Sequence, residues 1–256
     1  MKRLLMAVTL ALLAVGSHGQ DELETHMKAL WYLPSPGTST CAQTPDDLVS
    51  FYPAEGTAID VAGIYSGTPI GDAGYATGLV NQAFSFDGVG DYVYLASAPS
   101  ATTFTIEAWV YLIGDHPNYA SIYAGLQQGF WLANRRLDWW DGGDLFIGDT
   151  PIPPDEWHHI AVSYDGGSGS FVGYVDGVND GMSSFMGASL PVPAYLGGDP
   201  FGEDLTGLID ELSVYNRVLS ESEIQGIFAA GGEGKCLMFI GHFETGDASR
   251  WSGTVP

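Results

Sequence analysis

The chain has 256 residues, of which 31 are acidic and 8 are basic, and its formal net charge at pH 7 is −23. A charge of this size repels nucleic acid and anionic membrane surfaces, so we expect neither as a partner. The 35 glycines and 14 prolines indicate many turns, and the 7 tryptophans, 13 tyrosines and 12 phenylalanines supply a substantial core. This composition excludes a disordered chain and is typical of β structure.

The N-terminal residues predict export. A short basic start is followed by an apolar run over residues 4–15 and by small residues at Ser17 and Gly19, the −3 and −1 positions of a cleavage site. This pattern indicates a secretory signal peptide over residues 1–19, which is too short to span a membrane. No later segment holds the roughly 18 apolar residues that a transmembrane helix needs. We therefore expect a secreted protein, extracellular, periplasmic or at the cell surface, without membrane insertion.

The two cysteines, Cys41 and Cys236, mark the limits of one predicted domain. An even pair is normally bridged in an oxidising compartment, and closing so long a loop stabilises a fold by roughly 5 kcal/mol on the chain-entropy model. Residues 20–40 end in a stretch rich in proline and read as a linker. The predicted organisation is this linker, a domain over residues 41–236 and a C-terminal tail over residues 237–256.

Segments of alternating hydrophobicity recur between glycine, aspartate and proline turns from Leu48 onward. The clearest segment covers residues 103–112, where one face is apolar and the other is mixed, as on a sheet whose second face is partly covered. The apolar positions are Phe104, Ile106, Ala108, Val110 and Leu112. Further strands are predicted over residues 157–164, 171–176 and 205–215, and Asp-Gly steps after the first two favour hairpin turns.

One helix follows these strands. Ser220 and Glu223 have the spacing of a capping box, and Gly231-Gly232 ends the helix. Its apolar stripe consists of Ile224, Ile227 and Phe228. Many strands and one terminal helix predict an all-β fold, a two-sheet antiparallel jelly-roll sandwich with one short C-terminal helix.

Three segments carry a resemblance to a known family: residues 82–93 (QAFSFDGVGDYV), 156–166 (EWHHIAVSYDG) with a following YVDG, and 207–220 (GLIDELSVYNRVLS). In this order and spacing they resemble the laminin-G-like jelly-roll domains of secreted bacterial proteins, part of the concanavalin-A-like lectin/glucanase superfamily. The resemblance covers residues 41–236, and it implies a concanavalin-A-like sandwich closed by a terminal disulfide.

The pattern does not predict an enzyme. Glucanases of the superfamily carry a Glu-x-Asp-x-Glu run that puts carboxylates on one face of a strand. This run is absent from the sequence, and the adjacent pairs Glu203-Asp204 and Asp210-Glu211 would point to opposite faces of a strand. A glycoside-active enzyme would need two convergent carboxylates, which the sequence pattern does not show.

Calcium is the cofactor that the resemblance implies. In the family an ion often joins the opening loop, the loop after the second strand and the last strand. Hard cations such as Ca²⁺ take six to eight oxygen ligands. The matching positions are Asp60, Asp87 with the Gly88 carbonyl, and Asp210. The alternative is structural: turn caps for Asp60 and Asp87, and a hydrogen bond within the sheet or a pair with Arg217 for Asp210.

Trp139 and Trp140 are the candidate ligand platform. Adjacent side chains on a strand point to opposite faces, so one of the two should face away from the core. An exposed tryptophan beside polar groups suits stacking on a sugar, and Asp141, Asn134 and Arg135 could supply those groups. The alternative is that this tryptophan covers a sheet edge. Trp109 and Trp157 also lie on regular strands, where large aromatic side chains are more often core.

These observations favour a secreted, non-catalytic binding or adhesion module that recognises extracellular carbohydrate, with a glycan or a surface protein as partner. The alternative is a structural or protein–protein interaction domain of the cell envelope.

Overall fold

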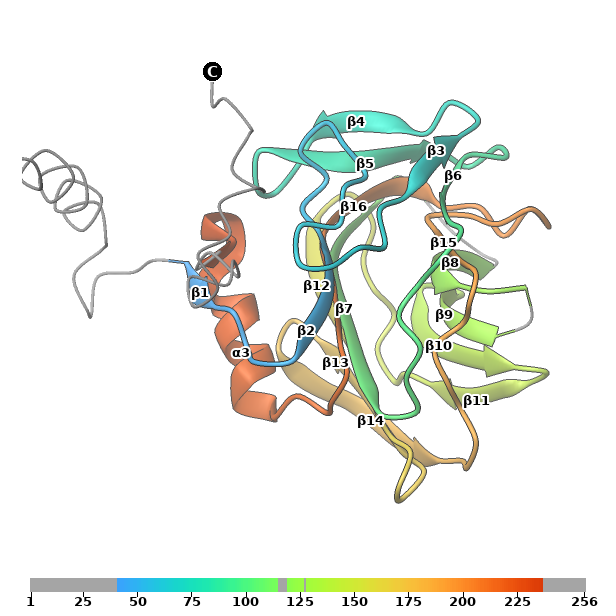
Figure 1. Ribbon diagram of the computed structural model, residues 1–256, viewed down its shortest axis with the longest axis vertical. Helices are drawn as coiled ribbons and strands as arrows, with labels where there is room; N and C mark the ends of the chain where they lie inside the picture. Colours follow the sequence, from blue (N-terminus) through green and yellow to red (C-terminus); the bar gives the residue numbers. More distant parts are fainter. Residues whose placement is uncertain (1–40, 115–118, 127, 237–256) are drawn as a thin grey trace, which may run out of the picture. The chain divides into compact units, whose positions relative to one another are not determined.

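The computed structural model describes residues 41–114, 119–126 and 128–236 (Figure 1). This part is a sandwich of two antiparallel sheets with one α-helix, α3 (Glu221–Ala230), outside it. The predicted fold class is therefore confirmed. The predicted signal peptide (1–19), linker (20–40) and tail (237–256) lie outside the described residues. None of the described helices is long and apolar enough to cross a membrane.

The first sheet has seven strands, and all its neighbours run antiparallel. In spatial order they are β11 (Asp144–Ile147), β10 (Arg136–Asp141), β9 (Gln128–Ala133), β8 (Tyr119–Ala124), β15 (Ala194–Leu196), β6 (Tyr92–Leu95) and β3 (Thr68–Ile70). Strands β8 to β11 lie on the right in Figure 1, on the side of the sandwich away from α3.

The second sheet has eight strands. In spatial order seven of them are β14 (Val178–Ser184), β13 (Ser170–Val175), β12 (Trp157–Asp165), β7 (Phe104–Leu112), β16 (Thr206–Tyr215), β5 (Gln82–Asp87) and β4 (Gly74–Thr77). The eighth, β2 (Leu48–Tyr52), pairs with β16 beyond a bulge that interrupts the β16–β7 ladder. A separate parallel pair, β1 (Ala42–Gln43) and β17 (Lys235–Cys236), joins the two ends of the domain after the short 3₁₀-helix η1 (Gly231–Glu233).

The main core fills the space between the two sheets. The predicted apolar positions of β7 all belong to it, and so do Phe130 and Leu132 of β9 and Leu137 and Trp139 of β10. The alternation along β7 was therefore read correctly. Burial of these side chains is the main stabilisation of the sandwich, at about 25 cal/mol for each Å² of apolar surface removed from water.

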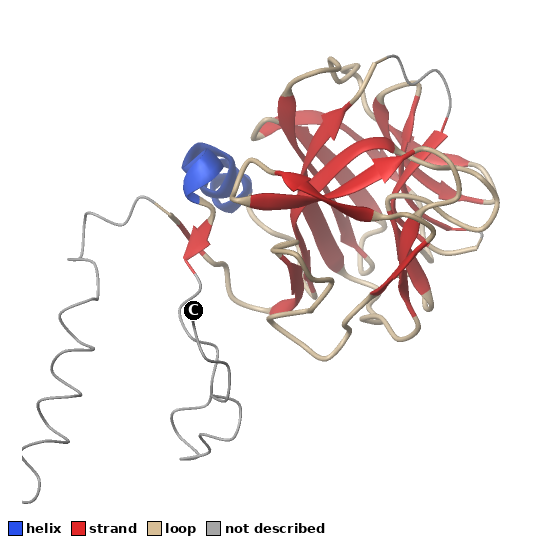
Figure 2. Cartoon of the chain, turned by 90° about the horizontal axis from the view of Figure 1, so that it is seen from above, coloured by secondary structure: helices blue, strands red, loops and turns tan. Residues whose placement is uncertain are grey.

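The outer face of the eight-stranded sheet is also covered. Trp109 on this face is 6% exposed and stacks on Phe228 of α3, with 5.8 Å between ring centroids. Ile224 and Ile227 of the helix are buried in the same second cluster as Ala161 of β12. Seen from above, the helix forms a separate layer beside the strands (Figure 2). Trp157 is not the core residue that the sequence pattern predicted. It is the first residue of β12, is only half-buried, and packs edge-on against Tyr111.

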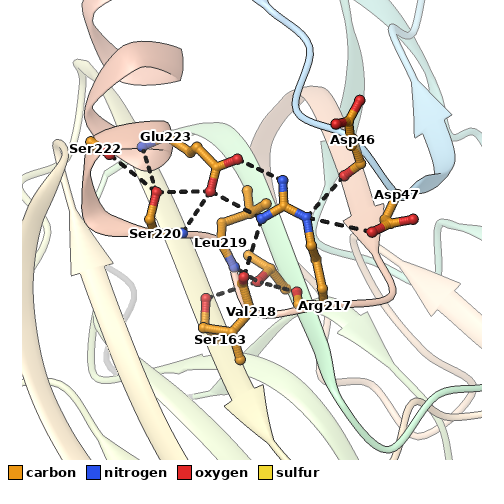
Figure 3. A network of polar contacts seen from close by, with 10 residues as sticks. Asp46, Asp47, Ser163, Arg217, Val218, Leu219, Ser220, Ser222 and Glu223 are labelled. Atoms are coloured by element: carbon orange, nitrogen blue, oxygen red, sulfur yellow. Dashed lines mark hydrogen bonds and ion pairs between the residues drawn. The ribbon is translucent and has the colours of Figure 1, made fainter.

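The start of α3 is fixed by the predicted capping box. Glu223 N donates to Ser220 Oγ, and the Glu223 carboxylate accepts from Ser220 N at 2.8 Å. Arg217 approaches the same carboxylate with two nitrogens and also donates to the Asp46 carbonyl (Figure 3). The arginine pair and the capping bonds lower the pKa of Glu223 to about 2. The strand β16 is thus joined to the helix and to the first turn of the domain.

A disulfide and a buried lysine fasten the last strand to the sheet. Cys41 and Cys236 form the predicted disulfide, with 5.2 Å between their Cα atoms. The Lys235 ammonium lies 3.1 Å from Glu107 Oε1 and 3.6 Å from Glu211 Oε2, and it is 1% exposed. The other Glu107 oxygen is 3.1 Å from His159 Nε2, and both of these side chains are fully buried. Burial alone would raise the pKa of Glu107, but Lys235 and His159 together hold it below its ordinary value.

Replacing Lys235 with methionine should lower the free energy of unfolding by about 3 kcal/mol or more, because it leaves two buried carboxylates without their cation. Denaturant unfolding of the oxidised protein measures this loss. The control is Arg217→Met, which breaks the partly exposed pair with Glu223 and should cost only about 1 kcal/mol. Equal losses in the two variants would contradict the special role of the buried cation.

Candidate functional site

The two adjacent tryptophans of β10 point to opposite sides of the seven-stranded sheet. Trp139 is fully buried and packs on Phe104 and Phe171, at 5.0 and 5.5 Å between ring centroids. Trp140 lies on the outer face, is partly exposed, and meets Tyr119 edge-on at 6.1 Å. The expectation that one of the pair faces outward holds for Trp140. Trp139 is a core residue and cannot contact a ligand, which corrects the predicted set.

Asn134 and Arg135 form the turn between β9 and β10, with positive φ values of 50° and 63°. Positive φ at both central residues is typical of a type I′ hairpin turn. The turn lies at the opposite end of β10 from Trp140 and Asp141, roughly 16 Å away at the rise of a strand. The predicted ligand set is therefore divided, and only Trp140 and Asp141 lie near each other.

The outer face of this sheet carries a row of polar and aromatic side chains. Ser121 of β8, Trp131 of β9 and Asp138 of β10 are successive cross-strand neighbours. They are 0%, 2% and 0% exposed. Farther along the same sheet, Tyr195 of β15 pairs with Tyr94 of β6, with 5.4 Å between their rings. The face is thus lined with aromatic side chains from β10 to β6.

A loop between β15 and β16 folds over this row. The Glu203 carbonyl accepts from Ser121 N at 2.9 Å, and Leu205 N donates to the Gly197 carbonyl, which closes the loop. Asp199 within the loop is 2% exposed and accepts from the amide of Phe201, whose ring is 68% exposed. We call the group formed by Tyr119, Trp131, Asp138, Trp140, Asp144 and Glu203 the β8–β10 site.

Burial, and then nearby negative charge, raise the pKa of two carboxyl groups in the β8–β10 site. Burial, followed by the negative charges of Asp144 and Glu203, raises the pKa of Asp138 to about 8. Neither Asp138 oxygen has a hydrogen-bond partner among the described residues. Burial, and then the charge of Asp199, raise the pKa of Glu203. The indole nitrogen of Trp131 has no hydrogen-bond partner among the described residues. At the edge of the site, Tyr119 OH donates to Asp144 Oδ1 at 3.2 Å.

This arrangement offers a partly exposed indole and phenol beside carboxylates, over a buried and protonated acid. The predicted set lacks five members of the site, which are Tyr119, Trp131, Asp138, Asp144 and Glu203. One signal was available in the alternation of β10, since Asp138 and Trp140 are two residues apart and share a face. The contribution of Glu203 could not be read from the pattern, because it depends on where a distant loop folds.

The residues predicted to hold calcium lie in three separate places. The Asp60 carboxylate accepts five hydrogen bonds, from Ser50 Oγ and from the amides of Phe51, Ala62, Gly63 and Tyr65. It is therefore a turn cap with no oxygen left free for an ion, which was the structural alternative. Asp87 and Gly88 lie at the end of β5, where Asp87 pairs with Thr206.

Asp210 lies four residues along β16 from Thr206, roughly 13 Å from the level of Asp87 at the rise of a strand. It is fully buried, and its Oδ2 accepts from Val80 N at 2.9 Å. Its Oδ1 has no partner among the described residues, and burial raises the pKa of this carboxyl to about 7. Asp60, Asp87, Gly88 and Asp210 thus do not form one site. The described carboxylates that do converge are Asp72, Asp87 and Asp91.

Comparison with known proteins supports the fold. A family model described as the concanavalin A-like lectin/glucanases superfamily matches residues 87–225. Domain 4 of AbnA, an extracellular arabinanase from Geobacillus stearothermophilus solved with arabinotriose, is similar in structure, with a TM-score of 0.56 and 22% identity over 70% of this chain and 97% of that chain. No curated protein matches the sequence.

Two further solved structures share the fold over part of their length. The binding domain of Paraclostridial Mosquitocidal Protein 1 has a TM-score of 0.58 and 18% identity, over 72% of this chain and 52% of that chain. Trypanosoma rangeli sialidase has a TM-score of 0.54 and 22% identity, over 77% of this chain and 35% of that chain. The chain therefore spans about half of the first and about a third of the second.

The raised pKa of Asp138 predicts that stability falls as the pH rises from 5 to 8. In this range the folded protein holds a proton on Asp138 that the unfolded chain has released, so each pH unit should cost up to about 1.4 kcal/mol. Asp138→Asn should flatten this dependence, with little effect at pH 5 and a gain at pH 8. Thermal or denaturant unfolding across the pH range measures it, with the exposed Asp46→Asn as control. Parallel curves for wild type and Asp138→Asn would contradict the assignment.

Proposed function

Because the chain belongs to the concanavalin A-like lectin/glucanases superfamily, we propose that it is a non-catalytic carbohydrate-binding module that recognises a glycan through the β8–β10 site. The observation that carries this proposal is the outward position of Trp140. It is partly exposed and held edge-on against Tyr119, at the margin of a sheet face that bears carboxylates and further aromatic rings.

The side chains at this margin have the chemistry that sugars need. The faces of indole and phenol rings are apolar and rigid, so they can stack on the C–H face of a pyranose or furanose with little loss of conformational entropy. Asp144 is exposed, and the Glu203 carboxyl is partly exposed, so both can accept hydrogen bonds from hydroxyl groups. The exposed Phe201 ring at the tip of the neighbouring loop adds a second apolar surface.

A binding role fits this geometry better than catalysis. Asp138 is protonated near neutral pH and would be the natural general acid, but it is fully buried. A general acid must come within hydrogen-bond reach of the leaving oxygen. A glycan on Trp140 would be separated from Asp138 by the groups that cover it, so the acid supports the floor of the site without reaching the ligand.

We place this module outside the cell. The predicted signal peptide supports export, and the disulfide between Cys41 and Cys236 is the kind of bond that persists in oxidising compartments. The negative charge of the chain also agrees with a neutral or cationic partner and disfavours an acidic one.

Replacing Trp140 or Tyr119 with alanine should weaken glycan binding about ten-fold or more while leaving the fold intact, because these rings form the stacking surface. The exported protein is screened on an array of glycans and polysaccharides, and the variants are then compared on each hit by titration. Trp157→Ala is the matched control, since Trp157 is also half-buried and packs edge-on against a tyrosine, but on the other sheet. This variant should bind like the wild type.

Equal binding by all three variants would remove the β8–β10 site from the proposal. An array without hits for folded protein would instead favour a protein-binding role of the same face. Release of reducing sugar from any bound polysaccharide would contradict the non-catalytic assignment.

A further inference from the structure

Two turns that cross between the sheets lie side by side at one rim of the sandwich. The turn over residues 71–73 connects β3 to β4, and the turn over residues 88–91 connects β5 to β6. Strand β3 pairs with β6 in one sheet, and β4 pairs with β5 in the other. The turns are in close contact, because a Cβ on Gly71 would lie 2.7 Å from the Gly90 carbonyl oxygen.

Three carboxylates converge where these turns meet. Asp72 belongs to the first turn, Asp87 directly precedes the second turn, and Asp91 is the last residue of the second turn. One oxygen from each lies within 4.8 Å of an oxygen of the others. Two oxygens bound to one Ca²⁺ at its usual distances are at most about 5 Å apart, so the three groups fit the shell of a single ion. Asp72 and Asp87 are exposed, so an ion and its waters can reach them from solvent.

Asp91 supplies independent support for a ligand here, because it is 1% exposed and only half satisfied. Its Oδ2 accepts from Asp87 N at 2.8 Å, which holds the turn. Its Oδ1 is buried and has no hydrogen-bond partner among the described residues. Burial, and then the charges of Asp87 and Asp72, raise the pKa of this carboxyl. A buried carboxyl oxygen without a hydrogen bond is costly, and two further carboxylates close by add to that cost unless a cation joins the three groups.

Basic side chains of the described residues do not supply that cation. Lys235 lies between Glu107 and Glu211, and Arg217 pairs with Glu223. The two remaining arginines, Arg135 and Arg136, donate to main-chain carbonyls around the β9–β10 turn.

A fourth carboxylate adds to the negative charge beside the rim. Asp204 Oδ2 accepts from Gly90 N at 2.8 Å, while its Oδ1 is buried without a hydrogen-bond partner among the described residues. Asp204 comes from the loop between β15 and β16, so a third segment of the chain reaches this place. The negative charge is therefore contributed by all the segments that meet there.

We propose that Asp72, Asp87 and Asp91 bind one Ca²⁺ ion, which joins the two crossing turns and thereby fastens the two sheets together at this rim. Calcium fits better than magnesium, because carboxylates from two separate turns suit its irregular shell of six to eight oxygens, whereas magnesium demands a near-ideal octahedron. Of the residues that the family resemblance indicated, this site contains Asp87 alone.

The site makes two linked predictions for the exported protein. Titration with Ca²⁺, followed by calorimetry and by displacement of luminescent Tb³⁺, should show one saturable site per chain. Calcium should also raise the melting temperature above its value in chelator. Both readouts are independent of glycan, so their outcome does not depend on the proposed function.

Asp91→Asn and, separately, Asp72→Asn should reduce the calcium affinity at least ten-fold and abolish the rise in melting temperature. In chelator the same variants should melt no lower than the wild type. Each relieves repulsion between like charges, and in Asp91→Asn the side-chain carbonyl oxygen can still accept from the Asp87 amide. Two controls should bind like the wild type: Asp210→Asn, at the position that the resemblance indicated, and the exposed Asp46→Asn.

Absence of saturable Ca²⁺ binding in the wild type would overturn the proposal. Unchanged binding in Asp72→Asn and Asp91→Asn would also overturn it, as would loss of binding in Asp210→Asn alone. Because Asp72 is exposed on a turn, its variant keeps the test decisive even if Asp91→Asn fails to fold.

Discussion

The fold depends on a single ammonium group in the space between the eight-stranded sheet and the two ends of the domain. Strands β7 and β16 are covered on both faces, so the outward side chains Glu107 and Glu211 are buried. The Lys235 ammonium lies between these two carboxyl groups, and the Lys235 amide also donates to Glu211 Oε2 at 3.2 Å. The last strand must therefore return to the centre of the sheet, where the disulfide from Cys236 ties it to the first strand. Helix α3 belongs to the chain segment that connects β16 to β17, and it lies on this outer face of the eight-stranded sheet.

Some other buried carboxyl groups of the described domain have no lysine or arginine side chain beside them. The described residues include four basic ones, and all four act elsewhere in the domain, at the last strand, at the start of α3 or at the β9–β10 turn. Partly unsatisfied buried carboxyl groups gather at the β8–β10 site, around Asp138, and at the rim, around Asp91. A buried carboxyl that has neither a cation nor enough hydrogen bonds, unlike Asp60, either keeps its proton or recruits an ion. Asp138, far from solvent, is the first case, and the open cluster with Asp91 is suited to the second.

Local sequence patterns predicted the elements well, but not which distant residues meet. The alternation of Phe104 to Leu112 gave both faces of β7, and Ser220 with Glu223 gave the start of α3, because these signals lie within one element. The Trp139–Trp140 pair indicated that one ring faces outward, but which one depends on the pairing of β10 with β9. Asp60 illustrates the reverse error. Its position matched a calcium ligand by resemblance, yet its five hydrogen bonds arise from the loop that folds around it.

The loop between β15 and β16 connects the two regions to which we assign binding. Glu203 and Asp204 are consecutive residues of this loop, and they contact different regions. The Glu203 carbonyl binds the amide of Ser121 beneath the β8–β10 site, whereas the Asp204 carboxylate binds the amide of Gly90 at the rim. An ion that fixes the turn around Gly90 would also fix Asp204, and with it the adjacent Glu203 carboxyl and the exposed Phe201 ring. The ion would then reduce the entropy that this loop loses when a ligand orders it. If both proposals hold, the ion at the rim would also set how rigid the edge of the proposed glycan site is.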